Sequence, residues 1–188
     1  MSHHYKGDPT NTENYRGISL LDTTYKVLTT DLLNRIEKYA SEIIGEYQCG
    51  FRKGKSTSDH IFIIRQTMEK YYEYDKDLYM IFIDFKQAYD SINRNQLWIA
   101  LEDYGFPRKP VRLIRNCNSN TFCRVRYLGE TSTQFEVRNR LRQGDSLSPT
   151  LFNQALERVI REMQNSREME MLGRNTWLAY VDDIVILG

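Results

Sequence analysis

The 188-residue sequence has no long hydrophobic run, few prolines, three cysteines and three histidines. No stretch approaches the roughly 18 consecutive apolar residues of a membrane-spanning helix, and the polar N-terminus lacks the apolar segment of a signal peptide. Cys49, Cys117 and Cys123 form no CxxC pair, and the histidines are too scattered for a zinc site. We therefore expect reduced thiols, a cytoplasmic and/or nuclear protein, and no membrane partner.

The sequence also lacks an excess of charge of either sign. Its 26 basic and 25 acidic residues leave a net charge of +1, so the overall charge does not indicate a polyanionic partner. Residues 105–145 differ, because they contain nine basic and three acidic residues, a net charge of +6. Arg138, Arg140 and Arg142 alternate there, as on one face of a strand, which favours a track for nucleic-acid phosphates. A charged edge strand that keeps the protein soluble is the alternative.

Hydrophobic periodicity and turn residues predict an α+β order of elements. A polar segment, residues 1–16, begins the chain without a regular pattern. A continuous apolar run at residues 78–85 predicts a strand buried on both faces, and hairpins are expected around Gly129–Glu130 and around Asp182–Asp183. The predicted helices cover about residues 24–43, 61–74, 95–104, 110–116 and 147–163. No repeat or low-complexity linker separates these elements, so we expect one compact body.

Three aspartates lie in apolar surroundings. Asp84 ends the run "LYMIFIDF", and Asp182 and Asp183 interrupt "LAYVDDIVIL". An ionised carboxylate beside a packed sheet is costly unless something compensates its charge, and Mg²⁺ favours carboxylate oxygens together with phosphates. If the two strands are neighbours, the three acids could hold two ions about 4 Å apart, an arrangement that serves phosphoryl or nucleotidyl transfer. The alternative is that two aspartates simply form a polar turn.

Five ordered segments carry a family resemblance. "FIDFKQAYDSI", "LRQGDSLSPTLFN" and "LAYVDDIVIL" resemble the successive palm motifs of reverse transcriptases. "NYRGISLLDTTYKVLTTDLLNRI" and "QCGFRKGKSTSDHIFIIRQ" are similar to finger segments of the non-LTR (LINE-like) retrotransposon branch, although that branch more often has Ala where Val181 stands. The resemblance implies an α+β polymerase right hand whose antiparallel palm sheet is backed by helices. Fingers would occupy residues 1–77 and palm residues 78–188, interleaved in one truncated domain without a thumb.

The same resemblance implies RNA-directed DNA polymerase activity, the transfer of a nucleotide from a dNTP to a primer 3′-hydroxyl. Asp84, Asp182 and Asp183 would be the catalytic and metal-binding residues, with two Mg²⁺ ions as cofactors and Mn²⁺ as a substitute. The partners would be an RNA template, a DNA primer and a dNTP. Because the sequence stops where the catalytic hairpin closes, we expect low or no activity from this chain alone.

Further roles follow from the resemblance. Tyr89 would lie beside the sugar of the incoming nucleotide and exclude a 2′-hydroxyl, unless it is a core tyrosine. Gln143 and Gly144 would contact the nascent base pair, where glycine permits a close backbone approach. Arg16 and Lys26 would clamp the triphosphate, although basic residues on surfaces are usually only solvated. The expected template and primer contacts are Arg52, Arg138, Arg140 and Arg142.

Other functions fit parts of the sequence. A catalytically inactive remnant that binds RNA would keep the basic segment without the chemistry. A group II intron-type reverse transcriptase, or maturase, shares several of the motifs. An RNA-dependent RNA polymerase is a third alternative, and Tyr89 argues against it because its ring would exclude ribonucleotides.

Overall fold

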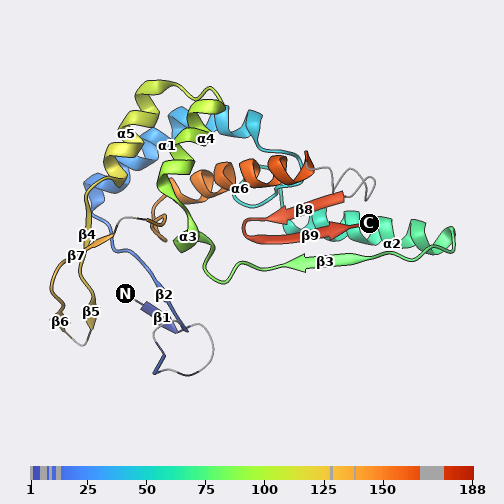
Figure 1. Ribbon diagram of the computed structural model, residues 1–188, viewed down its shortest axis with the longest axis horizontal. Helices are drawn as coiled ribbons and strands as arrows, with labels where there is room; N and C mark the ends of the chain where they lie inside the picture. Colours follow the sequence, from blue (N-terminus) through green and yellow to red (C-terminus); the bar gives the residue numbers. More distant parts are fainter. Residues whose placement is uncertain are drawn as a thin grey trace.

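The computed structural model describes residues 2–4, 8, 10–11, 14–127, 129–137, 139–165 and 176–188. The helices are α1 (Thr23–Ile43), α2 (Thr57–Glu73), α3 (Ala88–Ser91), α4 (Arg94–Asp103), α5 (Arg108–Asn118) and α6 (Ser148–Gln164). The strands are β1 (Ser2–His4), β2 (Tyr15–Gly17), β3 (Met80–Ile83), β4 (Thr121–Cys123), β5 (Arg126–Tyr127), β6 (Glu130–Thr131), β7 (Phe135–Val137), β8 (Thr176–Tyr180) and β9 (Asp183–Leu187). Helices pack on one face of a three-stranded antiparallel sheet, and the hairpin formed by β4, β5, β6 and β7 projects from the other end of the molecule (Figure 1).

Side chains fix where the predicted helices begin. The Asp22 carboxylate accepts a hydrogen bond from the Thr24 amide at 2.8 Å at the start of α1. Asn93 accepts from two amides at the start of α4, and Ser56 forms a capping box at the start of α2. All five long helices predicted from periodicity are present, while the short helix α3 was not anticipated. None of the described helices combines the length and apolar character needed to cross a bilayer.

The hydrophobic core lies around α6. In Figure 1, α6 lies between the sheet and the helices α1, α4 and α5. Its residues Leu151 and Ile160 are 1% exposed and belong to the same buried cluster as Ile36 of α1 and Ala179 of β8. Residues assigned to fingers and to palm therefore share one core, and the division between residues 1–77 and 78–188 stays a prediction.

The sheet has the order β3-β9-β8, with antiparallel pairs throughout. The prediction that residues 78–85 form a strand buried on both faces is wrong. The strand is shorter, Met80–Ile83, and Ile81 and Phe82 are 59% and 70% exposed. The physical reason is that successive side chains point to opposite faces of a strand, and Ile81 and Phe82 are both exposed, so neither face of β3 is covered where these two residues lie. β3 is also an edge strand among the described residues, because β9 pairs with one of its sides and no described strand pairs with the other. A continuous apolar run therefore indicated a strand correctly but not its burial.

The segment after α5 forms the predicted hairpin in two pieces. β4 pairs with β7 at the base, and β5 pairs with β6 near Gly129, which has a φ of 86°. The ladder ends at Val137, and the chain turns at Arg140 with a φ of 74°. Arg140 and Arg142 consequently lie outside any strand, so the predicted same-face row of arginines is wrong for these two. Arg138 lies outside the described residues.

Candidate active site

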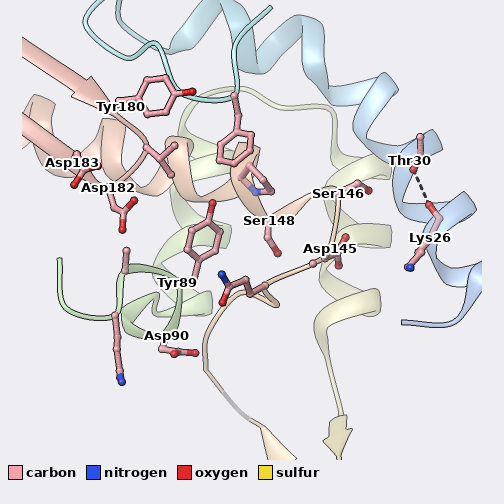
Figure 2. Close-up of a pocket in the computed structure, with 17 residues that line it drawn as sticks. Lys26, Thr30, Tyr89, Asp90, Asp145, Ser146, Ser148, Tyr180, Asp182 and Asp183 are labelled. Atoms are coloured by element: carbon pink, nitrogen blue, oxygen red, sulfur yellow. Dashed lines mark hydrogen bonds between the residues drawn. The ribbon is translucent and has the colours of Figure 1, made fainter. Parts of the chain in front are cut away.

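Segments far apart in the sequence line one pocket of about 730 Å³. Figure 2 shows Lys26 and Thr30 of α1 on one side and Asp182 and Asp183 of the β8–β9 hairpin on the other. The loop that leads into α6 and the helix α3 form the walls between them. The remaining lining residues are Phe51, Gln87, Ala88, Tyr89, Asp90, Gln143, Gly144, Asp145, Ser146, Ser148, Pro149, Tyr180 and Val181.

The β8–β9 hairpin presents two carboxylates to this pocket. Tyr180 and Asp183 form its last residue pair, so Val181 and Asp182 are the two turn residues and Asp183 begins β9. Val181 has a φ of 60°, a left-handed conformation that is unusual for a β-branched residue. Hairpin turns with a positive φ at the first central position normally place glycine, asparagine or aspartate there, and not a β-branched residue. The turn that carries Asp182 is therefore strained.

Asp84 lies beside this hairpin but does not line the pocket. β3 ends with the pair Ile83–Ile184, so Asp84 and Asp183 are the next residues along the two strands. Within the described ranges, no three His, Cys, Asp or Glu side chains lie close enough together to hold a metal ion. The predicted convergence of three carboxylates is thus incomplete in this conformation. Asp182 and Asp183 still provide hard oxygen donors of the kind Mg²⁺ prefers.

Tyr89 lines the pocket close to Asp182, while its predicted position beside a nucleotide sugar stays a prediction. Its ring stacks on Phe152 of α6, with centroids 5.1 Å apart and an interplanar angle of 19°. Burial raises the pKa of Tyr89 to about 12, and the negative charge of Asp182 adds to this effect. The phenol is therefore neutral at physiological pH and presents a fixed ring to the pocket beside Asp182 (Figure 2).

The Gln143–Gly144 turn is attached by its backbone to the segment before α1. The Ser19 amide donates to the Gln143 carbonyl at 2.9 Å. Gly144 has a φ of 105°, and a Cβ there would lie 3.1 Å from the Ser19 carbonyl oxygen. Glycine is needed because only it adopts this backbone conformation readily and leaves room for the Ser19 carbonyl. Both predicted residues line the pocket.

A polar network fixes the rest of this loop. The Tyr25 hydroxyl of α1 donates to Asp145 Oδ2 at 2.7 Å and accepts from Arg142 Nη1 at 2.5 Å. Arg142 Nη2 also donates to Thr121 Oγ1 and to the Cys117 carbonyl, at 2.8 and 3.0 Å. Burial and the neighbouring Asp145 carboxylate both raise the pKa of Tyr25. Arg142 therefore joins α1, α5 and β4, which explains why it is not part of a strand row.

The other basic residues proposed from sequence have varied surroundings. Lys26 reaches the pocket from α1. Arg52 Nη1 donates to the Gly45 and Gln48 carbonyls at 2.9 and 3.1 Å, so its mostly buried guanidinium holds the loop before α2. Arg140 Nη1 lies 3.7 Å from Asp90 Oδ1. The backbone of Arg16 is part of β2.

Several pocket residues were not singled out by sequence reasoning. Asp145, Ser146 and Ser148 belong to the same "RQGDSLSP" segment as Gln143, so their proximity in sequence was an available signal. Thr30 lies one helical turn after Lys26 on α1, and the same reasoning applies. Phe51, which is 65% exposed, had no such signal because its loop approaches the pocket only through tertiary contacts.

Comparisons with known proteins agree with this arrangement. A family model described as "Reverse transcriptase (RNA-dependent DNA polymerase)" matches residues 5–188. The chain is 24% identical to "Transposon TX1 uncharacterized 149 kDa protein" of Xenopus laevis, over 97% of this chain and 14% of that protein. It is also 24% identical to "Retrovirus-related Pol polyprotein from type-2 retrotransposable element R2DM" of Drosophila melanogaster, over 94% of this chain and 17% of that protein.

A solved structure is similar in fold. Telomerase from Candida albicans, in complex with the TWJ fragment of telomeric RNA, matches with a TM-score of 0.58 and 11% identity. The match covers 87% of this chain and 30% of that chain. At this identity the likeness concerns the fold alone, and it confirms the predicted α+β polymerase fold of fingers and palm. The chain spans less than a third of the length of each of these three proteins.

Proposed function

The chain belongs to the reverse transcriptase (RNA-dependent DNA polymerase) family, and we propose that its pocket binds a deoxynucleoside triphosphate for RNA-templated DNA synthesis. Its relatives come from non-LTR retrotransposons, as the sequence motifs predicted. One observation carries the proposal: Asp182 and Asp183 share a single pocket with Tyr89, Gln143 and Lys26. Carboxylates, a fixed ring, an amide and a cation are the groups that a nucleotide's metal-bound phosphates, sugar and base require.

Asp182 and Asp183 would hold divalent metal ions, together with Asp84 at the adjacent position of β3. Such ions, when bound, supply Lewis-acid activation of the primer hydroxyl and charge neutralisation on the triphosphate. The chain's own contribution is to fix the carboxylates at the end of a rigid hairpin. Lys26 lies across the pocket, where its ammonium would neutralise phosphate charge (Figure 2).

Tyr89 would select the sugar. Its ring is fixed between Phe152 and the hairpin, so a ribose 2′-hydroxyl would meet an aromatic face that cannot move aside. Gln143 and Gly144 form the wall from which a backbone and an amide could contact the nascent base pair. Arg16 remains a proposed triphosphate ligand on the strand before α1.

The template would follow the basic helix α5 and the hairpin beyond it. α5 exposes Arg108, Lys109, Arg112 and Arg115 along its length. These four cations would contact phosphates without reading the sequence, and their contribution should fall steeply with salt. Arg52, Arg138, Arg140 and Arg142 stay proposed as template or primer contacts, although Arg142 and Arg52 already donate to groups within the fold.

Primer extension tests this function. A longer protein that contains this chain is supplied with an RNA template, an annealed DNA primer, dNTPs and Mg²⁺, and it is compared with its Asp182→Asn variant. Wild-type protein should extend the primer, and the variant should lose extension by about two or more orders of magnitude, because a carboxylate ligand becomes a neutral amide. Equal extension by the two proteins would remove the catalytic assignment.

The alternative of an inactive protein that binds RNA has a distinct outcome in the same experiment. Salt-dependent RNA binding without metal-dependent synthesis, both in the chain and in a longer protein that contains it, would favour binding alone. The exposed cations of α5 motivate this alternative. A group II intron-type enzyme has no specific observation in its favour.

A further inference from the structure

Gln48 makes an unusual set of contacts to the turn that carries Asp182. Its side chain is 1% exposed, and it lies 133 residues before Val181 in the sequence. Gln48 Nε2 donates to the Val181 carbonyl at 3.1 Å, and Gln48 Oε1 accepts from the Val181 amide at 2.9 Å. The carboxamide thus satisfies both backbone polar groups of one residue, as a neighbouring strand would.

The same oxygen also organises the loop from which Gln48 comes. Gln48 Oε1 accepts a second hydrogen bond from the Gly50 amide at 2.8 Å. A Cβ on Gly50 would lie 2.4 Å from the Val181 nitrogen, a distance that real Cβ atoms do not tolerate. Glycine at position 50 therefore lets the loop backbone lie directly against the turn.

Backbone contacts hold this loop beside β8. Gln48 and Ala179 form a parallel bridge, in which the Ala179 amide donates to the Tyr47 carbonyl at 2.8 Å. The Cys49 amide donates to the Ala179 carbonyl at 2.9 Å. The loop is therefore held against β8 by one isolated bridge, which brings the Gln48 side chain to the turn.

These contacts matter because Val181 is strained. Its φ of 60° costs on the order of 1–3 kcal/mol for a non-glycine residue, and such a conformation persists only when the surroundings impose it. If the Val181 peptide groups were released, the turn could relax toward a negative φ. The Asp182 backbone follows directly and would change direction with it.

We propose that Gln48 is a positioning residue: its carboxamide holds Val181 in the left-handed conformation and so sets where the Asp182 and Asp183 carboxylates lie. The proposal rests on the proposed function, because it concerns the same metal-binding carboxylates. Gln48 touches no nucleotide in this role. It acts through the backbone of Val181, and the structure supplies both hydrogen bonds needed.

The test compares two buried glutamines. Gln48→Met keeps the length and apolar volume of the side chain but removes its three hydrogen bonds to the turn and loop. Gln154→Met is the matched control, because Gln154 is 0% exposed and its Nε2 donates to the Ala40 carbonyl at 3.2 Å, away from the hairpin. Amide hydrogen exchange at Val181 and Gly50 is measured by NMR in both variants and in wild type, together with Mn²⁺ affinity by electron paramagnetic resonance.

Gln48→Met should speed exchange at the Val181 amide by about tenfold or more relative to the Gln154→Met control. It should also weaken Mn²⁺ binding by about tenfold or more, the usual effect of removing a group that orients metal ligands. Equal exchange and equal Mn²⁺ affinity in the two variants would overturn the proposal.

Two further outcomes are informative. If Gln48→Met does not fold, amide hydrogen exchange at Val181 is measured in the wild-type protein instead. Exchange at the rate of an unstructured peptide would overturn the proposal, and slower exchange supports it. If wild type binds no Mn²⁺, the proposed metal site fails, whereas the exchange comparison still tests the positioning of the turn independently.

Discussion

Tyr25→Phe should destabilise the folded chain and disturb the nucleotide pocket, because it removes one oxygen from the centre of a polar network. The Tyr25 hydroxyl joins the Asp145 carboxylate and the Arg142 guanidinium, with bonds of 2.7 and 2.5 Å. Phenylalanine keeps the ring, and thereby keeps the contact in which Arg142 lies 5.1 Å from the ring centre. The substitution therefore isolates the hydroxyl.

The size of the effect follows from what each partner retains. Asp145 keeps the bond from the Leu147 amide, and Arg142 keeps its bonds to Thr121 and to the Cys117 carbonyl. Each charged group loses one hydrogen bond, and a bond to a charged group contributes about 1.5–3 kcal/mol. Because Tyr25 is only half-buried and water can replace part of the loss, we expect about 2–3 kcal/mol in total. For a chain of this length that lowers Tm by about 4–12 °C.

Urea and thermal unfolding followed by circular dichroism measure this change, with Tyr72→Phe as the control because Tyr72 is 88% exposed. A double-mutant cycle with Asp145→Asn should give a coupling energy of about 1 kcal/mol or more. In primer extension the variant should raise KM for dNTP more than it lowers kcat, since Asp145 adjoins Gly144. The reasoning is refuted if Tyr25→Phe and Tyr72→Phe unfold alike and the cycle shows no coupling.

Two other predictions concern tyrosines. Stability should fall most strongly above about pH 10, because Tyr25, Tyr47 and Tyr89 have raised pKa values when folded and ionise first in the unfolded chain, at about 10. The thiols of Cys49 and Cys117, whose pKa burial also raises, add a smaller fall that begins at about pH 8.5. Equal stability at pH 7 and pH 11 in urea denaturation would contradict this prediction. Tyr89→Ala should admit ribonucleotides in primer extension, and unchanged discrimination between dNTP and rNTP would remove Tyr89 as the sugar gate.

Patterns over a few neighbouring residues predicted the helices and the positions where they begin. Apolar residues at helical spacing gave α1 and α6, and Asp22 and Asn93 act as caps within three residues of the amides they bind. The burial of β3 could not be predicted in this way. The run around Ile81 and Phe82 is as apolar as a central strand, and its exposure depends on which elements pack on the two faces of β3, which no local pattern records.

The site was predictable for residues that belong to a sequence motif and line the pocket, and it was unpredictable for residues that support one another through tertiary contacts. Tyr89, Gln143 and Asp182 lie in motifs whose residue types suit a nucleotide, and all three line the pocket. Arg142, in contrast, looked like one of three alternating surface arginines. Its actual partners, Tyr25 and Thr121, are 117 and 21 residues away, and no spacing rule connects them.

Two buried polar residues show that the stability of the fold and the geometry of the site place different requirements on this chain. Gln48 and Asp145 are 1% and 5% exposed. The side chain of each accepts a hydrogen bond from a backbone amide, that of Val181 for Gln48 and that of Leu147 for Asp145. Gln48→Met removes one partner from each of three hydrogen bonds and leaves the Val181 amide, the Val181 carbonyl and the Gly50 amide behind, and each buried group left unsatisfied costs about 1–3 kcal/mol. A destabilisation of the fold is therefore expected in Gln48→Met, and the Gln154→Met control separates it from the site geometry: a loss of Mn²⁺ affinity in Gln48→Met alone, measured where both variants are fully folded, would mean that Gln48 fixes where Asp182 lies.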